Sequence, residues 1–405
     1  MINNSLIVKF FECASIQRWN DHVRPVEFTE LDKQAHKMII AYVIAKFEEQ
    51  RGNCVEWIDL IEGAMFELLQ RSVLTDIKSP VFHQMMRDNK ANLDTHVIEQ
   101  LRQECDLDSR RGDSLAANLE QYLRDEEYAS REKSILKAAH YLATNWEFKI
   151  IYHVSPFVYG IEKTKEMIEN QIEDHYNLAG VQEIMLHKKL YGFIDLCGQL
   201  RFQTRWAQSP RIPKTSVLGH MLLVSLMGYL CSREIGACRK RLYNNFFSAL
   251  FHDLPEVLTR DIVSPVKDSV PQLKQWLSGY ERRQVEERIL PLLPEAWHEE
   301  IRYFVIEEFE NKIREFGQTR TVGEITPEYN RDENSPRDGA MLKACDKLAA
   351  YIEALMSIDH GISSPHLRDA VQNIGQWLEQ QPVINRIDFR GLGCYFQERY
   401  PGRTT

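Results

Sequence analysis

Apolar residues recur along most of the chain with the spacing of amphipathic helices. This spacing gives each helix one apolar stripe and predicts a fold built by packing helices against one another. Sustained alternation of apolar and polar residues with hairpin turn signals is not found, so we expect an all-α fold. The predicted helices cover residues 34–47, 55–69, 132–151, 161–172, 217–230, 242–251, 285–293 and 339–356.

Composition narrows the class of protein. The 405 residues include only 19 Gly and 15 Pro, which favours long helices, and 43% are hydrophobic, which is enough for one large domain or two ordinary ones. Apolar runs stay far shorter than the roughly 18 residues of a membrane span, and Met1 to Leu6 do not read as a secretory signal. We therefore expect a cytoplasmic protein whose eight cysteines are reduced.

The net charge of the chain limits the kinds of binding partner that we expect. With 50 basic and 59 acidic residues the formal net charge is −9. Extended binding to a nucleic-acid backbone depends on clustered cations, so we do not expect it here. A small phosphorylated substrate remains compatible with this charge, because a single pocket can be locally positive.

Two segments of the chain resemble each other at an offset of 185 residues. The stretch around residue 64 and the stretch around residue 249 share identical residues in the same order. The matched positions are Ala64, Phe66, Leu69, Asp76, Ile77, Ser79, Pro80 and Val81 with Ala249, Phe251, Leu254, Asp261, Ile262, Ser264, Pro265 and Val266.

Two further matches occur in the same order along both halves. Arg18-Trp19 precedes His36 as Arg205-Trp206 precedes His220, and residues 136–140 match residues 342–346. Three collinear matches predict a tandem duplication with two helical bundles, residues 1–188 and residues 189–405.

Residues that could hold a metal gather in the second half. His220, His252, Asp253 and Asp346 lie on or beside three predicted helices, and Pro255 indicates that a helix ends near His252-Asp253. Two imidazoles and two carboxylates suit a divalent transition metal with open positions for water and substrate. Each residue alone is weak support, because a histidine on an apolar helix face is usually a hydrogen-bonded core residue.

The order and context of these residues are more specific. The second half contains the run His252-Asp253-Leu254-Pro255-Glu256-Val257-Leu258-Thr259-Arg260-Asp261, followed by Pro265-Val266-Lys267. Over roughly residues 195–360 the chain resembles the HD-domain metal-dependent phosphohydrolases, and within them the YfbR-like 5′-deoxynucleotidases. It departs from that family at Arg260, where Gly is usual, and in a longer stretch before Asp346. The added residues, about 318–337, are polar and predict a loop.

The resemblance implies a role for each matching residue. His220, His252, Asp253 and Asp346 would be ligands of one divalent metal ion, which could be Mn, Co, Zn, Fe or Ni. Glu256 would orient or deprotonate the attacking water, and Asp261 would lie beside the leaving group or sugar. Arg205, Trp206 and Lys267 would bind substrate. Simpler interpretations stay open: Glu256 as a solvated helix-end carboxylate, Asp261 as a turn cap and Trp206 as a core residue.

The implied activity is a 5′-nucleotidase that removes phosphate from (deoxy)nucleoside monophosphates. Hydrolysis of a nucleoside triphosphate or another phosphorylated metabolite is the first alternative. A nucleotide-sensing or scaffold protein without catalysis is the second.

The first half lacks the same set of residues. His36, Glu67-Leu68 and His140 stand at the matched places, and Arg71 stands where the second half has Glu256. We expect this half to be catalytically inert, although a site of His36, Glu67 and His140 or a nucleotide pocket without chemistry stays open. Because related single-domain enzymes form dimers, we expect the two halves to pair as an internal pseudo-dimer, with further homo-oligomers open.

Overall fold

The computed structural model describes residues 2–75, 77, 79–105, 107, 115–260 and 271–402. These form two compact units, each described by itself: an N-terminal unit of residues 3–198, and a C-terminal unit of residues 199–402 together with Ile2. We expected the division after residue 188. It falls after Gly198 because the Ile194 carbonyl accepts a hydrogen bond from His36, and Asp195 accepts one from Trp146.

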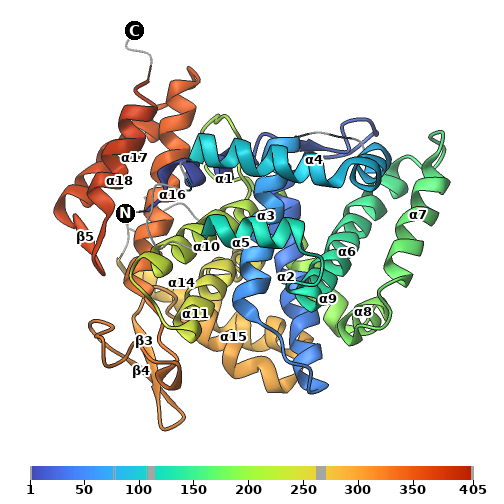
Figure 1. The fold of residues 1–405 in the computed structure, drawn as a ribbon. Helices are drawn as coiled ribbons and strands as arrows, with labels where there is room; N and C mark the ends of the chain where they lie inside the picture. Colours follow the sequence, from blue (N-terminus) through green and yellow to red (C-terminus); the bar gives the residue numbers. More distant parts are fainter. Residues whose placement is uncertain are drawn as a thin grey trace. The chain divides into compact units, whose positions relative to one another are not determined.

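The N-terminal unit is mostly helical (Figure 1). The long helix α2 packs against α6 and α3, and the short strands β1 and β2 pair just before α2 begins. Its elements are α1 (Asn4–Glu12), β1 (Gln17–Arg18), β2 (Phe28–Thr29), α2 (Glu30–Gln50), α3 (Trp57–Leu74), α4 (Ser79–Cys105), α5 (Leu115–Arg124), α6 (Ser130–Val154), α7 (Ile161–Glu173), α8 (Ala179–Met185) and α9 (Lys189–Gln199).

The C-terminal unit is also mostly helical, with α10 packed against α11 and α16. Its helical elements are η1 (Leu200–Phe202), α10 (Val217–Glu234), α11 (Arg239–Phe251), α12 (Glu256–Thr259), α14 (Pro271–Gln284), η2 (Val285–Ile289), η3 (Leu290–Leu292), η4 (Glu295–Trp297), α15 (His298–Val305), η5 (Asp332–Asn334), α16 (Gly339–Asp359), α17 (Pro365–Gln380) and α18 (Phe389–Arg399). Its strands are β3 (Lys312–Glu315), β4 (Gln318–Thr321), β5 (Val383–Ile384) and β6 (Ile387–Asp388).

Helix α10 is the centre of the C-terminal unit. Every residue from Val217 to Ser232 is buried, so the helix is enclosed on all sides and not along one stripe. The side chain of Ser216 caps its first turn by accepting a hydrogen bond from the backbone N–H of Gly219. A capped and enclosed helix is a rigid support for any residue near its N-terminus, including His220.

We expected an all-α fold. The described residues are mostly helical, and two details of the expectation were wrong. Residues 285–293 form a π-helical turn followed by a 3-10 turn, and not a regular α-helix. Within the described residues, three antiparallel pairs of short strands also form, including β3–β4, whose second strand begins the stretch predicted as a loop. Short hairpins of this kind were missed because each strand has only two to four residues, too few to show an alternation.

The polar insertion before α16 is tied to the core by Arg337 and Asp338. The buried Arg337 guanidinium donates hydrogen bonds to the carbonyls of Tyr303, Phe304, Glu307 and Glu310. Asp338 accepts two hydrogen bonds of 2.6 Å from Arg241 and further ones from Asn245 and Asn385. These contacts hold the beginning of α16, the helix that carries Asp346.

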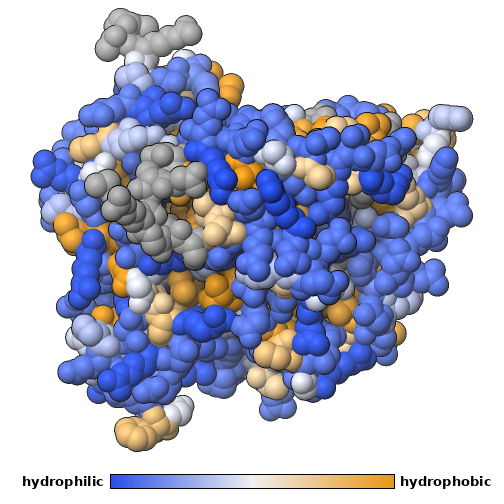
Figure 2. All heavy atoms as spheres, in the orientation of Figure 1, coloured by the Kyte–Doolittle hydropathy of each residue, from blue (hydrophilic) through white to orange (hydrophobic). Residues whose placement is uncertain are grey.

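Hydrophobic side chains lie mainly inside each unit, and the face seen in Figure 2 is mostly hydrophilic with scattered apolar patches. Across the described residues, no helix is both long and apolar enough to cross a membrane.

Replacing Asp338 by Ala would leave the Arg241 guanidinium buried without its carboxylate. Breaking a buried ion pair in this way typically costs about 3–5 kcal/mol. We expect a loss of that size in the free energy of unfolding of the C-terminal unit, measured by urea denaturation monitored with hydrogen exchange. The exposed Asp369 of α17 provides the control, since Asp369→Ala should change this energy by less than about 0.5 kcal/mol. Equal effects of the two changes would contradict the anchoring role of Asp338.

Candidate metal centre

Three packed helices bring the predicted metal ligands of the C-terminal unit together. His220 lies in the first turn of α10, and Asp346 lies in the third turn of α16. Helix α11 ends at Phe251, so His252 and Asp253 lie in the turn that leads to α12. The predicted helix end before Pro255 is confirmed, and it lets two adjacent side chains point to one place.

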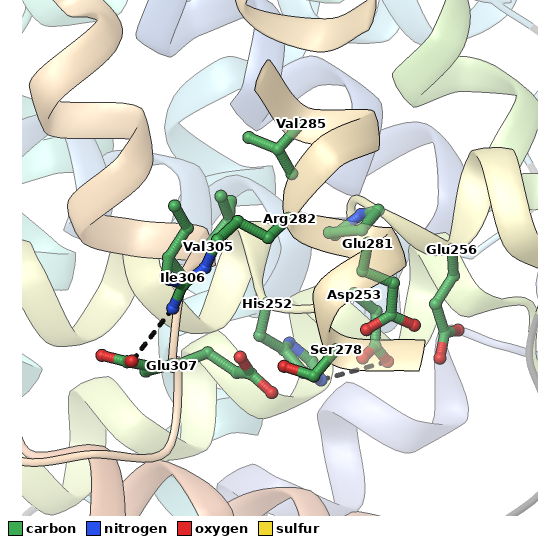
Figure 3. Close-up of a pocket in the computed structure, with 12 residues that line it drawn as sticks. His252, Asp253, Glu256, Ser278, Glu281, Arg282, Val285, Val305, Ile306 and Glu307 are labelled. Atoms are coloured by element: carbon green, nitrogen blue, oxygen red, sulfur yellow. Dashed lines mark hydrogen bonds and ion pairs between the residues drawn. The ribbon is translucent and has the colours of Figure 1, made fainter. Parts of the chain in front are cut away.

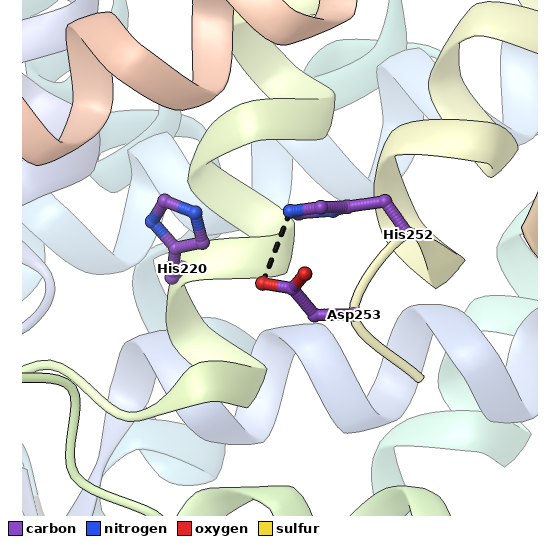
Figure 4. Close-up of side chains that lie close together, drawn as sticks. All are labelled: His220, His252 and Asp253. Atoms are coloured by element: carbon purple, nitrogen blue, oxygen red, sulfur yellow. Dashed lines mark ion pairs between the residues drawn. The ribbon is translucent and has the colours of Figure 1, made fainter. Parts of the chain in front are cut away.

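His220, His252 and Asp253 form a cluster whose ligand atoms all lie within 4.8 Å of one another. The two imidazole rings have centroids 5.6 Å apart, and Nε2 of His252 is 3.1 Å from Oδ2 of Asp253 (Figure 4). Both histidines are buried and Asp253 is partly exposed. The structure therefore offers a mixed imidazole and carboxylate donor set in an enclosed place.

Asp346 approaches the cluster from the side of His220. Its Oδ1 lies 2.9 Å from Nε2 of His220, and its side chain is 27% exposed. It contacts one member of the cluster directly and is not within ligand distance of all three. The four predicted ligands thus occupy one region, with Asp346 at its edge.

Hydrogen bonds orient the histidine that follows α11. Nδ1 of His252 donates a hydrogen bond of 2.7 Å to the Ala249 carbonyl, so the other ring nitrogen, Nε2, faces Asp253. Once the Nε2 proton is removed, an imidazole whose Nδ1–H is held by a backbone carbonyl has the usual form of a metal ligand. Together with the donor types present, this fits a divalent transition metal such as Mn, Co, Zn, Fe or Ni.

The charges around the cluster shift its pKa values. Burial by itself lowers the pKa of His252, but Asp253, Asp346 and the Ala249 carbonyl outweigh it and raise that pKa to about 9. Burial raises the pKa of Asp253, yet His252, Arg205 and His220 bring it well below its ordinary value. Without a metal, the cluster therefore holds a protonated imidazole against a carboxylate.

Arg205 and Trp206 lie beside this cluster. Nη1 of Arg205 is 3.6 Å from Oδ2 of Asp253, so the guanidinium borders the predicted metal position. The indole of Trp206 is half-buried and donates a hydrogen bond of 2.9 Å to Glu353, and its backbone φ of 61° lies in the left-handed region. The indole N–H is thus already paired with Glu353, and the predicted role of Trp206 in substrate binding stays a prediction.

A pocket open to solvent adjoins the cluster, and the space between its lining atoms, with the adjoining solvent included, is about 530 Å³ (Figure 3). Its lining includes His252, Asp253 and Glu256, together with carboxylates that the sequence did not indicate. It is lined by His252, Asp253, Pro255, Glu256, Ser278, Glu281, Arg282, Val285, Val305, Ile306, Glu307 and Glu308. Arg282 is paired with Glu307 at 3.0 Å, so its charge is already matched and the wall remains acidic.

Several of these carboxylates come from residues that sequence reasoning missed. Glu281 lies on α14, and Glu307 and Glu308 follow α15, far along the chain from the His-Asp motif. Burial raises the pKa of Glu308, which indicates an enclosed position. No local pattern pointed to them, because only the packing of α14 and α15 places them beside His252.

Two predicted residues, Asp261 and Lys267, lie outside the described residues. Their expected roles beside the leaving group and in substrate binding stay predictions. The motif residues Pro265 and Val266 lie in the same stretch.

In the N-terminal unit, the three side chains proposed as an alternative site face different partners. Nε2 of His36 contacts the Ile194 carbonyl, Glu67 pairs with Lys37 and accepts a hydrogen bond from Tyr122, and His140 contacts the amine of Lys33. The alternative of a three-ligand site at His36, Glu67 and His140 was therefore wrong. Within the described residues of this unit, no cluster of potential metal ligands is found.

Metal binding must remove the proton from Nε2 of His252, because a ligating imidazole is neutral at the metal-binding nitrogen. With the pKa of His252 at about 9 in the metal-free protein, this proton is bound at pH 7. We expect release of about one proton per metal ion at pH 7 to 8, and an apparent affinity that rises about tenfold per pH unit below pH 9. Calorimetric titration with Mn²⁺ in buffers of different ionisation enthalpy measures this release, and a heat independent of the buffer would contradict it.

Comparison with known proteins finds similarity over the part of the chain that carries this centre. Residues 197–375 match the family model described as HD domain. A 5′-deoxynucleotidase of Vibrio vulnificus is 21% identical over 176 residues, which cover 42% of this chain and 76% of that protein. One of Pasteurella multocida is 21% identical over 180 residues, covering 43% of this chain and 77% of its own. One of Vibrio cholerae is 26% identical over 176 residues, with 42% and 76% covered. The C-terminal part of the chain therefore contains an HD domain that is distantly similar to 5′-deoxynucleotidases.

Proposed function

We propose that the C-terminal unit is a metal-dependent phosphohydrolase that removes phosphate from (deoxy)nucleoside monophosphates. One observation carries this proposal: the His220, His252 and Asp253 cluster is bordered by a guanidinium. Arg205 lies 3.6 Å from the same Asp253 carboxylate that would hold the metal. A metal ion and a neighbouring arginine are groups that bind a phosphoryl group.

Each residue has a task in this proposal. A divalent metal held by the cluster would polarise a phosphoryl oxygen and lower the pKa of bound water toward neutrality. Arg205 binds the phosphoryl oxygens through its Nη atoms, because Glu353 lies near its Nε and Nη1 faces the cluster. This guanidinium stabilises the charge that builds on the phosphoryl oxygens during attack.

Glu256 is the candidate for handling the proton of the attacking water. It begins α12, is buried, and lines the pocket with His252 and Asp253. A carboxylate in that place can accept a proton from water and return one to the departing ribose oxygen. Asp261, predicted to lie beside the leaving group, is the second candidate for the acid.

The acidic pocket favours a substrate with a single phosphate. Glu281 and Glu308 line the space next to Asp253 and Glu256, while the charge of Glu307 is matched by Arg282 and Lys312. The additional phosphates of a triphosphate would face these carboxylates and be repelled. A neutral nucleoside can occupy the same space, since carboxylates accept hydrogen bonds from sugar hydroxyls.

The test is a substrate panel with the metal-loaded full-length protein. We expect phosphate release from nucleoside monophosphates, with slower or no release from triphosphates. Asp253→Ala and Glu256→Ala should each lower kcat about 10²–10⁴-fold, whereas Asp369→Ala on α17 should leave kcat unchanged. Triphosphate or other phosphorylated substrates as the best of the panel would favour the first alternative activity. Absence of phosphate release from every compound would favour a nucleotide sensor or scaffold.

We also propose that the N-terminal unit is a second, metal-free copy of this bundle. In each unit an Arg-Trp pair precedes a capped central helix and contacts a glutamate on a later helix. Arg18 and Trp19 contact Glu147 on α6, as Arg205 and Trp206 contact Glu353 on α16. Both tryptophans have a positive φ, 55° for Trp19 and 61° for Trp206.

The helix caps shift the register that the repeat predicted. Thr29 caps α2 and Ser216 caps α10 in the same manner, and the residues four positions later are Lys33 and His220. Lys33 contacts His140, as His220 contacts Asp346. Lys33, and not His36, therefore stands in place of the first histidine.

Basic side chains fill this region of the N-terminal unit. Lys33 is fully buried near Glu30, Lys37 pairs with Glu67, and Arg71 lies 3.8 Å from Glu30. A divalent cation would meet cations here and would lack the carboxylate that Asp253 supplies, because Leu68 stands at the matched position. The pairing of the two units as an internal pseudo-dimer remains a proposal.

This second proposal predicts about one tightly bound metal ion per chain. Metal analysis of the purified protein should find this ion lost in His220→Ala and kept in His140→Ala, because the two residues occupy different units. Two bound ions, or an ion retained by His220→Ala and lost in His140→Ala, would contradict a metal-free N-terminal unit.

A further inference from the structure

Glu353 is a buried carboxylate next to the candidate metal centre. It lies on α16 seven residues after Asp346, so the two side chains share one face of the helix two turns apart. Its side chain is fully buried. Such a charge must be matched by close partners, and all of its partners belong to the region around His220.

The two oxygens of Glu353 divide these partners between them. Oε2 accepts a hydrogen bond of 2.9 Å from the Trp206 indole and lies 3.6 Å from Nε of Arg205. Oε1 accepts a hydrogen bond of 2.6 Å from Thr215 and lies 3.7 Å from Nδ1 of His220. One oxygen thus serves the Arg-Trp pair, and the other faces the histidine.

The charges agree with an ionised Glu353. Burial raises the pKa of its carboxyl, but Arg211, Arg205 and His220 together bring that pKa well below the ordinary value. Arg211 is itself buried and donates a hydrogen bond to the Thr215 hydroxyl. Its positive charge therefore lies close to the Glu353 carboxylate.

The contact between Glu353 and His220 affects how His220 can bind a metal ion. Nε2 of His220 faces Asp346, and Nδ1 faces Glu353. At 3.7 Å the contact between Glu353 and Nδ1 is electrostatic and not a hydrogen bond. A carboxylate on this side of a ligating histidine favours the tautomer with the proton on Nδ1, which leaves Nε2 as the ligand nitrogen.

The N-terminal unit contains the same arrangement without the metal ligands. Glu147 lies on α6 seven residues after His140 and accepts hydrogen bonds from Trp19 at 2.8 Å and Arg18 at 3.0 Å. Lys33 stands in place of His220 there. The contact between arginine, tryptophan and glutamate therefore forms with or without a metal site, so Glu147 is a matched control for Glu353.

We propose that Glu353 is a positioning residue for two parts of the site, the metal ligand His220 and the phosphate-binding Arg205. It holds the Arg205 guanidinium where a phosphate binds, and it orients His220 as a metal ligand. The phosphate part of this statement rests on the proposed function, whereas the metal part requires only that the cluster binds a metal.

The experiment compares Glu353→Gln with Glu147→Gln in the full-length protein. Glutamine keeps the size of the side chain and one acceptor oxygen but removes the charge. We expect Glu353→Gln to weaken binding of Mn²⁺ or Co²⁺ about 10–100-fold, which calorimetry measures. Binding of inorganic phosphate to the metal-loaded protein should weaken as well, because Arg205 loses its orienting partner. Glu147→Gln should change neither affinity, although it removes an equally buried charge.

A second variant guards against misfolding. Thr215→Val removes the hydroxyl that holds Oε1, the oxygen facing His220, and leaves Glu353 in place. We expect it to weaken metal binding about three- to tenfold, the effect of one hydrogen bond.

The outcomes separate this inference from the proposed function. Unchanged metal affinity in a folded Glu353→Gln, or equal losses in Glu353→Gln and Glu147→Gln, would overturn it. If Glu353→Gln does not fold, unchanged metal affinity in Thr215→Val would overturn it instead. If the wild-type protein binds metal but hydrolyses no phosphate ester, the proposed function is wrong. The metal affinities of the variants would still test the role of Glu353.

Discussion

Charged side chains buried among the central helices must each be compensated, and this constraint organises both units. The C-terminal unit encloses Glu353 and the cluster around His252, while the N-terminal unit encloses Glu30 and Glu147. An uncompensated charge in such surroundings costs several kcal/mol. In the C-terminal unit the compensation comes from histidines, arginines and, in our proposal, a metal ion. In the N-terminal unit lysines and arginines supply it.

The candidate ligands His220, His252 and Asp253 lie at helix ends. Helix α10 is enclosed on all sides and provides a rigid first turn for His220, whereas the end of α11 lets two neighbouring side chains converge. The beginning of α16 is held by the Arg241 and Asp338 pair, which sets the height of Asp346 and Glu353 along that helix. Rigid helices with short turns can keep ligands and a guanidinium within the few tenths of an ångström that catalysis requires.

Some residues of the candidate site could be predicted from the sequence, and others could not. The His-Asp motif and the distant Asp346 were chosen from their order and context, and the structure brings the four candidate ligands into one region. In the proposed second copy, the helix caps align Lys33 and not His36 with His220, which residue types alone did not indicate because a cap is a local backbone feature. Glu353 was missed although its spacing from Asp346 was visible, since a glutamate on a helix is ordinarily exposed.

The amino-acid sequence by itself determined the helical class, the positions of most long helices, the end of α11 and the identity of the candidate ligands. These depend on periodicity, on proline and on residue type, all of which act over a few residues. Tertiary structure alone decided the partners of each buried charge: Lys33 beside His140, Glu353 between Arg205 and His220, and the acidic pocket formed by α14 and the segment after α15. Residues far apart along the chain make these contacts, and only packing of the helices brings them within bonding distance.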